Sequence, residues 1–426
     1  MNNKKGYLGR SVSIIGVGYT PMGNVRKSPE ILDMTERELF SWAAIEAMED
    51  AGIEAKEIDA FYVGQTGPAR FANQLATSTG LADWIGMRNK PSISHDEACS
   101  TANVGLQLAV MAVASGVYDM VLSGGTAVNQ GKFDLGSLPH MREEFDDLWF
   151  TMNALANDPA YLYPGSGMLT PLDAAAVSYA KKYGVSFDQL TKAMNQAAII
   201  ARKNAVNNPK AIFALQTYEE EASSLGFSSA EEYFNSPYNP PLGVLQRFKH
   251  TSPVADGASA LIVCSTDKAK QIVKEPIEII GMGASTSFGN QLVGTPFKGE
   301  VQAFEQAYQM ANITDPYKEV EYMAIHDCSA QHYFTTTEAG GYFKPGEGWK
   351  AVLDGKTAHD GEKPVNTTGG RLSCGHPLAG AAGIEIAEAV GQMKGINGPR
   401  QMPKPPKVSA IQCYGGGYHV NVTVLR

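Results

Sequence analysis

The sequence predicts a mixed α/β protein made of two similar halves, with a mostly helical segment inserted between them. A short β-branched run ending in G-x-G occurs twice, as SIIGVG at 13–18 and EIIGMG at 278–283. Each run opens a stretch in which strand patterns alternate with helix patterns. Such alternation is typical of a sheet covered by helices on both faces, and its recurrence indicates a duplicated α/β/α unit.

The first half, predicted over 1–125 plus 251–270, contains several strands and two helices. Apolar residues recur at helical spacing over 36–51, which predicts an amphipathic helix. AFYVG at 60–64 and DMVLSGG at 119–125 are predicted strands, and ADGASALIVCS at 255–265 adds another. The run that follows Cys99 is apolar on all sides, so we expect a buried helix there.

Residues 126–250 are richer in Asn, Pro, Tyr and acidic groups than their surroundings and include a predicted helical stretch at 172–206. We interpret them as an inserted domain that covers a site. The segment 131–170 is long, acidic and rich in aromatic residues, and aromatic side chains supply flat apolar walls. It therefore indicates a shaped pocket, although the same aromatic residues would also suit a loop core.

The second half, predicted over 271–426, repeats the alternation of strand and helix patterns seen in the first. A helix is predicted near 301–311, a strand at 322–328 (YMAIHDC), and a closing strand pair at SAIQCYG and YHVNVTVL.

Composition excludes several classes of protein. The 426 residues carry 35 Lys and Arg against 44 Asp and Glu, a net charge of −9, and contain no basic run. General nucleic-acid or membrane-surface binding is therefore not expected. The chain shows no signal-peptide core and no membrane-length apolar stretch. Its five cysteines lie far apart without a C-x-x-C, which argues against a disulfide framework or a zinc site and favours the cytoplasm.

Two segments place reactive side chains beside predicted helix starts. Cys99 precedes the buried helix, where free N–H groups and the helix dipole favour a thiolate, as a nucleophile requires. A buried structural cysteine is the alternative. His376 lies between Gly375 and Pro377 in GGRLSCGHPLAGAAG, again at a predicted helix start. A histidine that only satisfies core or surface contacts is the alternative there.

Two further segments lie in the second half. Cys413 is followed closely by three glycines in QCYGGGYHV. A glycine triplet between two strands costs stability, so close backbone approach or exposed N–H donors would explain it, as would a plain hairpin turn. In IHDCSAQHY, His326 ends an apolar strand and is followed by Asp327 and Cys328.

Together these motifs resemble the thiolase superfamily over essentially the whole chain. The resemblance rests on Cys99 before a buried helix, N-x-x-G-G followed by G-H-P-x-A-G-A-x-G, a terminal C-x-G-G-G, and the D-G-A block at Asp256. The H-D-C sequence at 326–328 is similar to the sterol-carrier-protein-x and archaeal branch. Ser329 departs from that branch, which has Phe, and leaves the shape of the pocket around His326 open.

The resemblance implies a thiolase fold with a five-layered core and a role for each motif. Cys99 would become acylated, His376 would take its proton, and Cys413 would be a second acid or base. His326 and His376 would form one oxyanion hole, and the N–H groups of Cys99 and Gly415 a second. The reaction implied is CoA-dependent cleavage of a β-ketoacyl-CoA, an acyltransferase activity without a metal.

The resemblance also implies ligands and partners. Coenzyme A would lie between the inserted domain and the core, with Ser252 against its pantetheine arm; a turn-capping serine is the alternative. Basic residues around Arg202 and Lys249 would meet its phosphates, or else form a solvated face. We expect a homodimer and, from the branch, a small zinc-ribbon/OB-fold partner protein. Similarity to the benzoylsuccinyl-CoA thiolases of toluene degradation suggests that substrate, with acetoacetyl-CoA as the alternative.

The same residues fit three other functions less well. The glycines from Gly16 to Gly23 do not match G-x-G-x-x-G, and Pro21 lies where the helix should begin, so dinucleotide binding is rejected. A ketoacyl synthase or hydroxymethylglutaryl-CoA synthase shares the fold, but the second thiol at Cys413 favours a thiolase. A catalytically silent acyl-CoA-binding scaffold would require the loss of a catalytic position, and none is lost.

Overall fold

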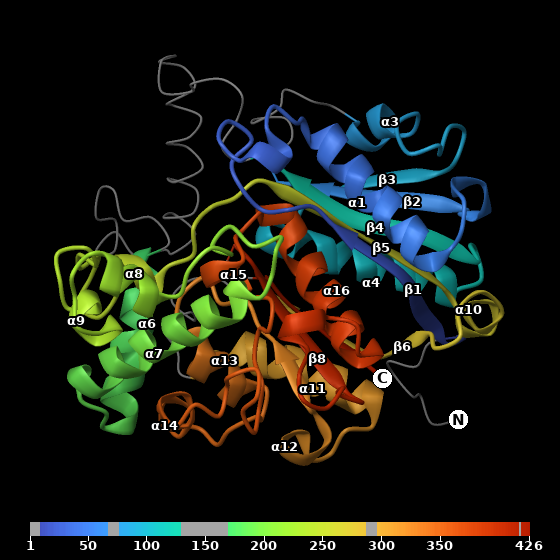
Figure 1. Ribbon diagram of the computed structural model, residues 1–426. Coiled ribbons are helices and arrows are strands. Elements are labelled where there is room, and N and C mark those ends of the chain that lie inside the picture. The colour runs from blue at the N-terminus through green and yellow to red at the C-terminus, as the bar shows by residue number, and fades with distance from the viewer. Residues whose placement is uncertain (1–8, 67–75, 129–168, 287–295, 417–418) are drawn as a thin grey trace.

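The computed structural model describes residues 9–66, 76–128, 169–286, 296–416 and 419–426 (Figure 1). Its strands form a sheet in the order β3-β2-β4-β5-β1-β6-β9-β8-β7. The first half supplies β1 (Val12–Tyr19), β2 (Ala60–Gln65), β3 (Ser92–His95), β4 (Met120–Ala127) and β5 (Gly257–Ser265). The second half supplies β6 (Ile277–Thr286), β7 (Tyr322–Ala324), β8 (Ser409–Gly415) and β9 (His419–Leu425). The halves join where β1 pairs antiparallel with β6.

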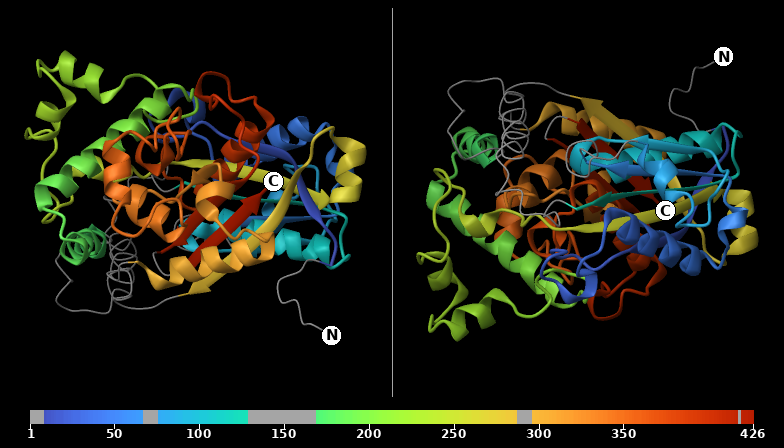
Figure 2. Two further views of the ribbon diagram at one scale, coloured as in Figure 1. Left: turned by 90° about the horizontal axis from the view of Figure 1, so that it is seen from below. Right: turned by 90° about the horizontal axis from the view of Figure 1, so that it is seen from above.

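Helices cover the strands of both halves and fill the space between them. Helix α1 (Glu36–Ala51) packs on the outer face of the first half, and α11 (Lys298–Ala311) packs on β6 and β9 of the second half. Helices α4 (Thr101–Ala114) and α16 (Ala381–Lys394) share one core with strands of both halves. Helices lie on both faces of the strands, so the mixed α/β class is confirmed, while the five-layered core stays a prediction (Figure 2).

The helical segment between the halves lies at one side of the strands (Figure 1). It comprises α6 (Leu169–Tyr183), α7 (Phe187–Val206), α8 (Tyr218–Ser224) and α9 (Ala230–Phe234). Shorter helices complete the described chain: α3 (Thr77–Leu81), α10 (Thr266–Ile272), α12 (Pro316–Glu319), α13 (His332–Ala339), α14 (Gly348–Leu353) and α15 (Gly370–Ser373). No helix in the described ranges is both long enough and apolar enough to cross a membrane.

The repeated G-x-G has a packing cause that is the same in both halves. A Cβ on Gly16 or Gly18 would lie 2.1 or 2.3 Å from a carbonyl oxygen of α1. A Cβ on Gly281 or Gly283 would lie 2.3 or 1.9 Å from a carbonyl oxygen of α11. Each strand also shifts register at its first glycine, between Ile14 and Gly16 and between Ile279 and Gly281. The glycines therefore let a helix rest directly on the strand, twice.

Several element predictions need correction. The stretch 172–206 is two helices, because Gly184 adopts a φ of 65° and Ser186 caps a new helix. The strand predicted at 322–328 ends at Ala324, so His326 lies beyond it. His376, by contrast, lies before a helix start as predicted, because a short 3-10 turn at 378–380 leads into α16. The aromatic segment 131–170 falls almost wholly outside the described residues.

Candidate active site

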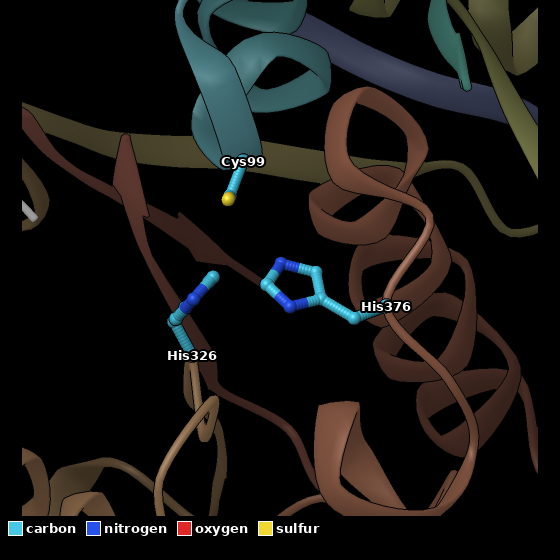
Figure 3. Close-up of side chains that lie close together, drawn as sticks. All are labelled: Cys99, His326 and His376. Carbon is cyan, nitrogen blue, oxygen red and sulfur yellow. The ribbon is translucent and has the colours of Figure 1, made fainter. Parts of the chain in front are cut away.

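Side chains from both halves converge at one point. Cys99 precedes α4, His326 follows β7 and His376 precedes α16, and their side chains face a common space (Figure 3). The Cys99 sulfur and a ring nitrogen of each histidine all lie within 4.8 Å of one another. Cys413, on β8, completes the group: its Sγ lies 3.1 Å from the Cys99 carbonyl oxygen and 3.3 Å from His326 Nδ1. The structure thus brings together the four side chains that the motifs single out.

Cys99 is held on a strained turn. Ala98, just before it, has a φ of 49°, in the left-handed region that a residue with a Cβ rarely adopts. The chain then passes through a 3-10 turn at 98–100 into α4. Gly415 allows this turn to approach β8, because a Cβ there would lie 2.5 Å from the Glu97 carbonyl oxygen. The turn presents a half-buried thiol from the start of a buried helix.

His326 is fixed by contacts from two motifs. Its backbone N–H donates to Gln412 Oε1 at 3.0 Å, next to Cys413. Asn366, the Asn of the N-x-x-G-G block, bonds both backbone groups of Ile325, accepting at 2.7 Å and donating at 3.1 Å. The imidazole is 2% exposed, and burial holds its pKa well below the usual value. His326 is therefore neutral at physiological pH.

His376 is oriented by a serine from the segment before β5. Ser252 Oγ lies 3.1 Å from His376 Nδ1, and His376 Nε2 is buried without a hydrogen-bond partner among the described residues. Burial lowers the pKa of His376 to about 3. The ring is therefore neutral at physiological pH and has a nitrogen available to take a proton. The sequence predicts Ser252 at the pantetheine arm and gives no sign of this contact with His376.

Burial opposes the thiolate that the helix start favours at Cys99. Burial and, to a smaller extent, the nearby Cys413 raise the pKa of Cys99 to about 12, and Arg371 and the Gly416 and Cys99 amides only partly oppose this. Burial likewise raises the pKa of Cys413 to about 11. Loss of solvation outweighs the helix start, because a thiolate in a dry site loses more hydration than the dipole returns. Both cysteines are thiols at neutral pH, and attack by Cys99 needs a base.

Polar groups occupy the place where the resemblance expects a Phe. Ser329 is fully buried, accepts from Gln246 Nε2 at 2.7 Å and donates to Gln331 Oε1 at 3.1 Å. Nearby, Cys328 Sγ lies 3.9 Å from His332 Nδ1. His332 stacks at a tilt on Tyr414, whose ring also meets that of His326 edge-on. The wall beside His326 is therefore built from hydrogen-bonding groups behind an aromatic ring.

A cavity of about 510 Å³ opens beside His376. Its lining includes Ser252 and the two cations Arg202 and Lys249. Arg202 is buried against the rings of Phe213 and Tyr218, 4.0 Å from each centroid. Both cations share a single carboxylate, that of Glu221, at 3.2 and 3.5 Å. The cavity wall thus carries one more positive than negative charge.

Comparison with known proteins agrees with these motifs. The thiolase N-terminal domain matches residues 12–128 and the thiolase C-terminal domain-like family matches residues 289–425. An acetyl-CoA acetyltransferase of Methanothermobacter thermautotrophicus is 30% identical over 92% of this chain and 93% of its own. The chain belongs to the thiolase family.

Two other matches cover nearly the whole chain. The benzoylsuccinyl-CoA thiolase subunit BbsB of Thauera aromatica is 27% identical over 96% of both chains. Among solved structures, the "Ltp2-ChsH2(DUF35) aldolase" matches with a TM-score of 0.75 and 21% identity over 98% of both chains. This thiolase is therefore an acyltransferase of the CoA-dependent kind, and coenzyme A is its co-substrate.

Proposed function

We propose that the protein cleaves a β-ketoacyl-CoA with coenzyme A, through an acyl group carried on Cys99. The observation that carries the proposal is the convergence of the Cys99 sulfur with His326 and His376 within 4.8 Å, beside Cys413. A nucleophile within reach of a neutral base, with a second acid next to both, is the minimum that thiolytic C–C cleavage requires.

The first step is attack on the β-carbonyl carbon. As the Cys99 sulfur bonds to that carbon, its proton passes to His376 Nε2, since Ser252 occupies the other ring nitrogen. The carbonyl oxygen becomes an oxyanion that the N–H groups of Cys99 and Gly415 would meet. Each such donor contributes about 3–4 kcal/mol to the stability of the transition state.

The second step breaks the bond between the α- and β-carbons. The electron pair moves into an acyl-CoA enolate, whose thioester oxygen accepts bonds from His326 and His376. Cys413 then gives its proton to the α-carbon; its buried thiol is protonated at neutral pH and suits this role. Finally, the first acyl-CoA leaves and the thiol of a second coenzyme A attacks the acyl group on Cys99. Its proton passes to the Cys413 thiolate, the departing Cys99 sulfur takes back the proton held on His376, and the acyl group is released as a new thioester.

The cavity beside His376 suits the coenzyme A arm. Its lining includes Ser252, whose hydroxyl lies 3.1 Å from His376 Nδ1, and also the cations Lys249 and Arg202. An excess of one positive charge favours a ligand that bears phosphates. In this assignment the pantetheine arm passes Ser252 and the nucleotide lies toward Lys249.

Acetoacetyl-CoA is the first substrate we propose, supported by the similarity to archaeal acetyl-CoA acetyltransferases over nine-tenths of the chain. Benzoylsuccinyl-CoA is the second, supported by the similarity to BbsB. For that substrate the products would be benzoyl-CoA and succinyl-CoA.

A cleavage assay tests the function. Purified protein with coenzyme A and either substrate should form the two acyl-CoA products, and Cys99→Ser should lower the rate by several orders of magnitude because the nucleophile is lost. Cys264→Ala, a buried cysteine of β5, is the matched control and should retain activity. Products formed at equal rates by Cys99→Ser would refute the proposal.

We also propose a homodimer that associates with a small zinc-ribbon/OB-fold partner protein. β3 is the terminal strand of the described sheet on the first-half side, and Ile93 on it is 42% exposed. An edge strand with unpaired N–H and C=O groups is a ready template for pairing with a second copy. Two similar proteins support the partner, since BbsB is named as a subunit and the name of the Ltp2-ChsH2(DUF35) aldolase joins two components.

A further inference from the structure

We propose that Arg371 is a positioning residue for the acid–base chemistry: it holds a permanent positive charge against the Cys413 sulfur and stabilises the thiolate left when Cys413 gives up its proton. The inference rests on the proposed function for the role of Cys413. The contacts that support it are independent of the substrate.

Arg371 is one of the largest fully buried side chains of the molecule, at 1% exposed. Its Nη2 lies 3.6 Å from Cys413 Sγ. Its Nη1 lies 3.2 Å from Glu385 Oε1, on α16. Its backbone N–H donates to Asp327 Oδ1 at 2.6 Å. The planar guanidinium is therefore fixed at both ends, between an acidic side chain and the thiol.

A buried cation needs a nearby group that stabilises its charge, because moving it out of water costs several kcal/mol. Glu385 is the counter-ion here, but burial raises the pKa of Glu385 to about 8. Near neutral pH the carboxyl is thus largely protonated, and the Arg371 charge remains available to Cys413. Among the influences on Cys413, burial raises the pKa most and Arg371 is the largest that lowers it.

The expected consequence concerns the proton that Cys413 transfers. A stabilised thiolate makes Cys413 a stronger acid, which favours protonation of the enolate during cleavage. The Arg371 charge affects the ionisation of several other groups in the site besides Cys413. These are Asp327, His326, His376, Cys99, Cys328, Cys374 and Glu385. The test must therefore isolate Cys413 from these neighbours.

Ultraviolet thiolate absorbance provides that isolation. Each protein is titrated beside the same protein carrying Cys413→Ala, and the difference reports Cys413 alone. Glu385→Gln removes the competing negative charge and should lower the ionisation midpoint. Arg371→Gln with Glu385→Gln removes both charges and should raise the midpoint by about one to three pH units, the usual effect of an adjacent opposite charge. Arg371→Lys with Glu385→Gln keeps a positive charge at this position, so its ionisation midpoint should lie close to that of Glu385→Gln alone.

A kinetic split distinguishes positioning from mere structural support. Exchange of the acetyl-CoA α-protons in deuterium oxide, which needs Cys413, should slow at least tenfold in the double variant. Acetylation of Cys99 by acetyl-CoA, which does not need Cys413, should slow by a smaller factor. Equal losses in both rates, or the same midpoint in Glu385→Gln and in the double variant, would overturn the proposal. If the double variant does not fold, Arg371→Gln alone is compared with the native protein, and an unchanged midpoint there would overturn it as well. Shifted midpoints in a protein that shows neither acetylation nor cleavage would instead refute the proposed function.

Discussion

At the scale of single residues, the contact between Ser252 and His376 decides which ring nitrogen takes the proton. Ser252 Oγ lies 3.1 Å from His376 Nδ1, and in the tautomer with Nδ1–H donating to that hydroxyl, Nε2 is the free base. Because burial keeps the ring neutral, the hydroxyl fixes its tautomer and orientation without needing a charge.

Ser252→Ala should therefore lower kcat about two- to tenfold, the worth of one neutral hydrogen bond. Steady-state kinetics with coenzyme A varied provide the measurement. Thr251→Ala is the control, because Thr251 lines the same cavity but donates to the Phe248 carbonyl. An unchanged kcat with a raised KM for coenzyme A would show that Ser252 acts on the pantetheine arm alone.

Motifs in the sequence single out Cys99, His326, His376 and Cys413. Each lies in a block of glycines or histidines that packing alone does not readily explain. Arg371 is not predictable in the same way, since an arginine in a sequence is expected at the surface until its surroundings are known. A signal was present nonetheless. Glu385 and Glu388 interrupt an otherwise apolar helix, and buried acidic groups require partners.

At the scale of elements, the G-x-G pairs show how a six-residue repeat predicts three-dimensional structure. The sequence indicates duplication through their recurrence, and the structure supplies the reason: helix backbone lies directly over both glycines of each pair. The apolar pattern continues on both sides of Gly184, so helical periodicity does not predict the break between α6 and α7. The local residues do indicate it, because the glycine is followed by Ser186 and Gln189, which form a capping box.

Gly283→Ala should destabilise the protein by about 1–3 kcal/mol, as overpacking of a core does, because its Cβ would lie 1.9 Å from the Ala303 carbonyl oxygen. Urea denaturation of the whole chain, followed by circular dichroism, is the measurement. Ala284→Val is the matched control, since Ala284 is the next residue of β6 and is exposed. Equal stability of Gly283→Ala and the native protein would contradict the packing account.

At the scale of the whole molecule, the two halves matter because neither holds a complete site. Cys99 comes from the first half, while His326, His376 and Cys413 come from the second. The layers could be predicted from the sequence because strand and helix patterns repeat. The way the segments around His326, Asn366 and Gln412 lock together could not, since those contacts join positions about forty or more residues apart.

The proposed dimer gives a prediction at this scale. Light scattering during size exclusion should show a dimer for the native chain and a monomer for Ile93→Lys, because a charge on β3 blocks edge pairing. Val117→Lys, at an exposed position beyond α4, should remain a dimer. A native monomer would contradict the proposed dimer, and full activity of the chain alone would contradict a required partner.

The central claim is that Cys99 carries the acyl group, and mass spectrometry of Cys413→Ala incubated with acetyl-CoA tests it most directly. Acylation needs His376 but not the second thiol, so one acetyl group should accumulate on the peptide that contains Cys99 and leave when free coenzyme A is added. Protein that stays unmodified, or acetyl groups found on Cys328 or Cys374 while Cys99 remains free, would contradict the account.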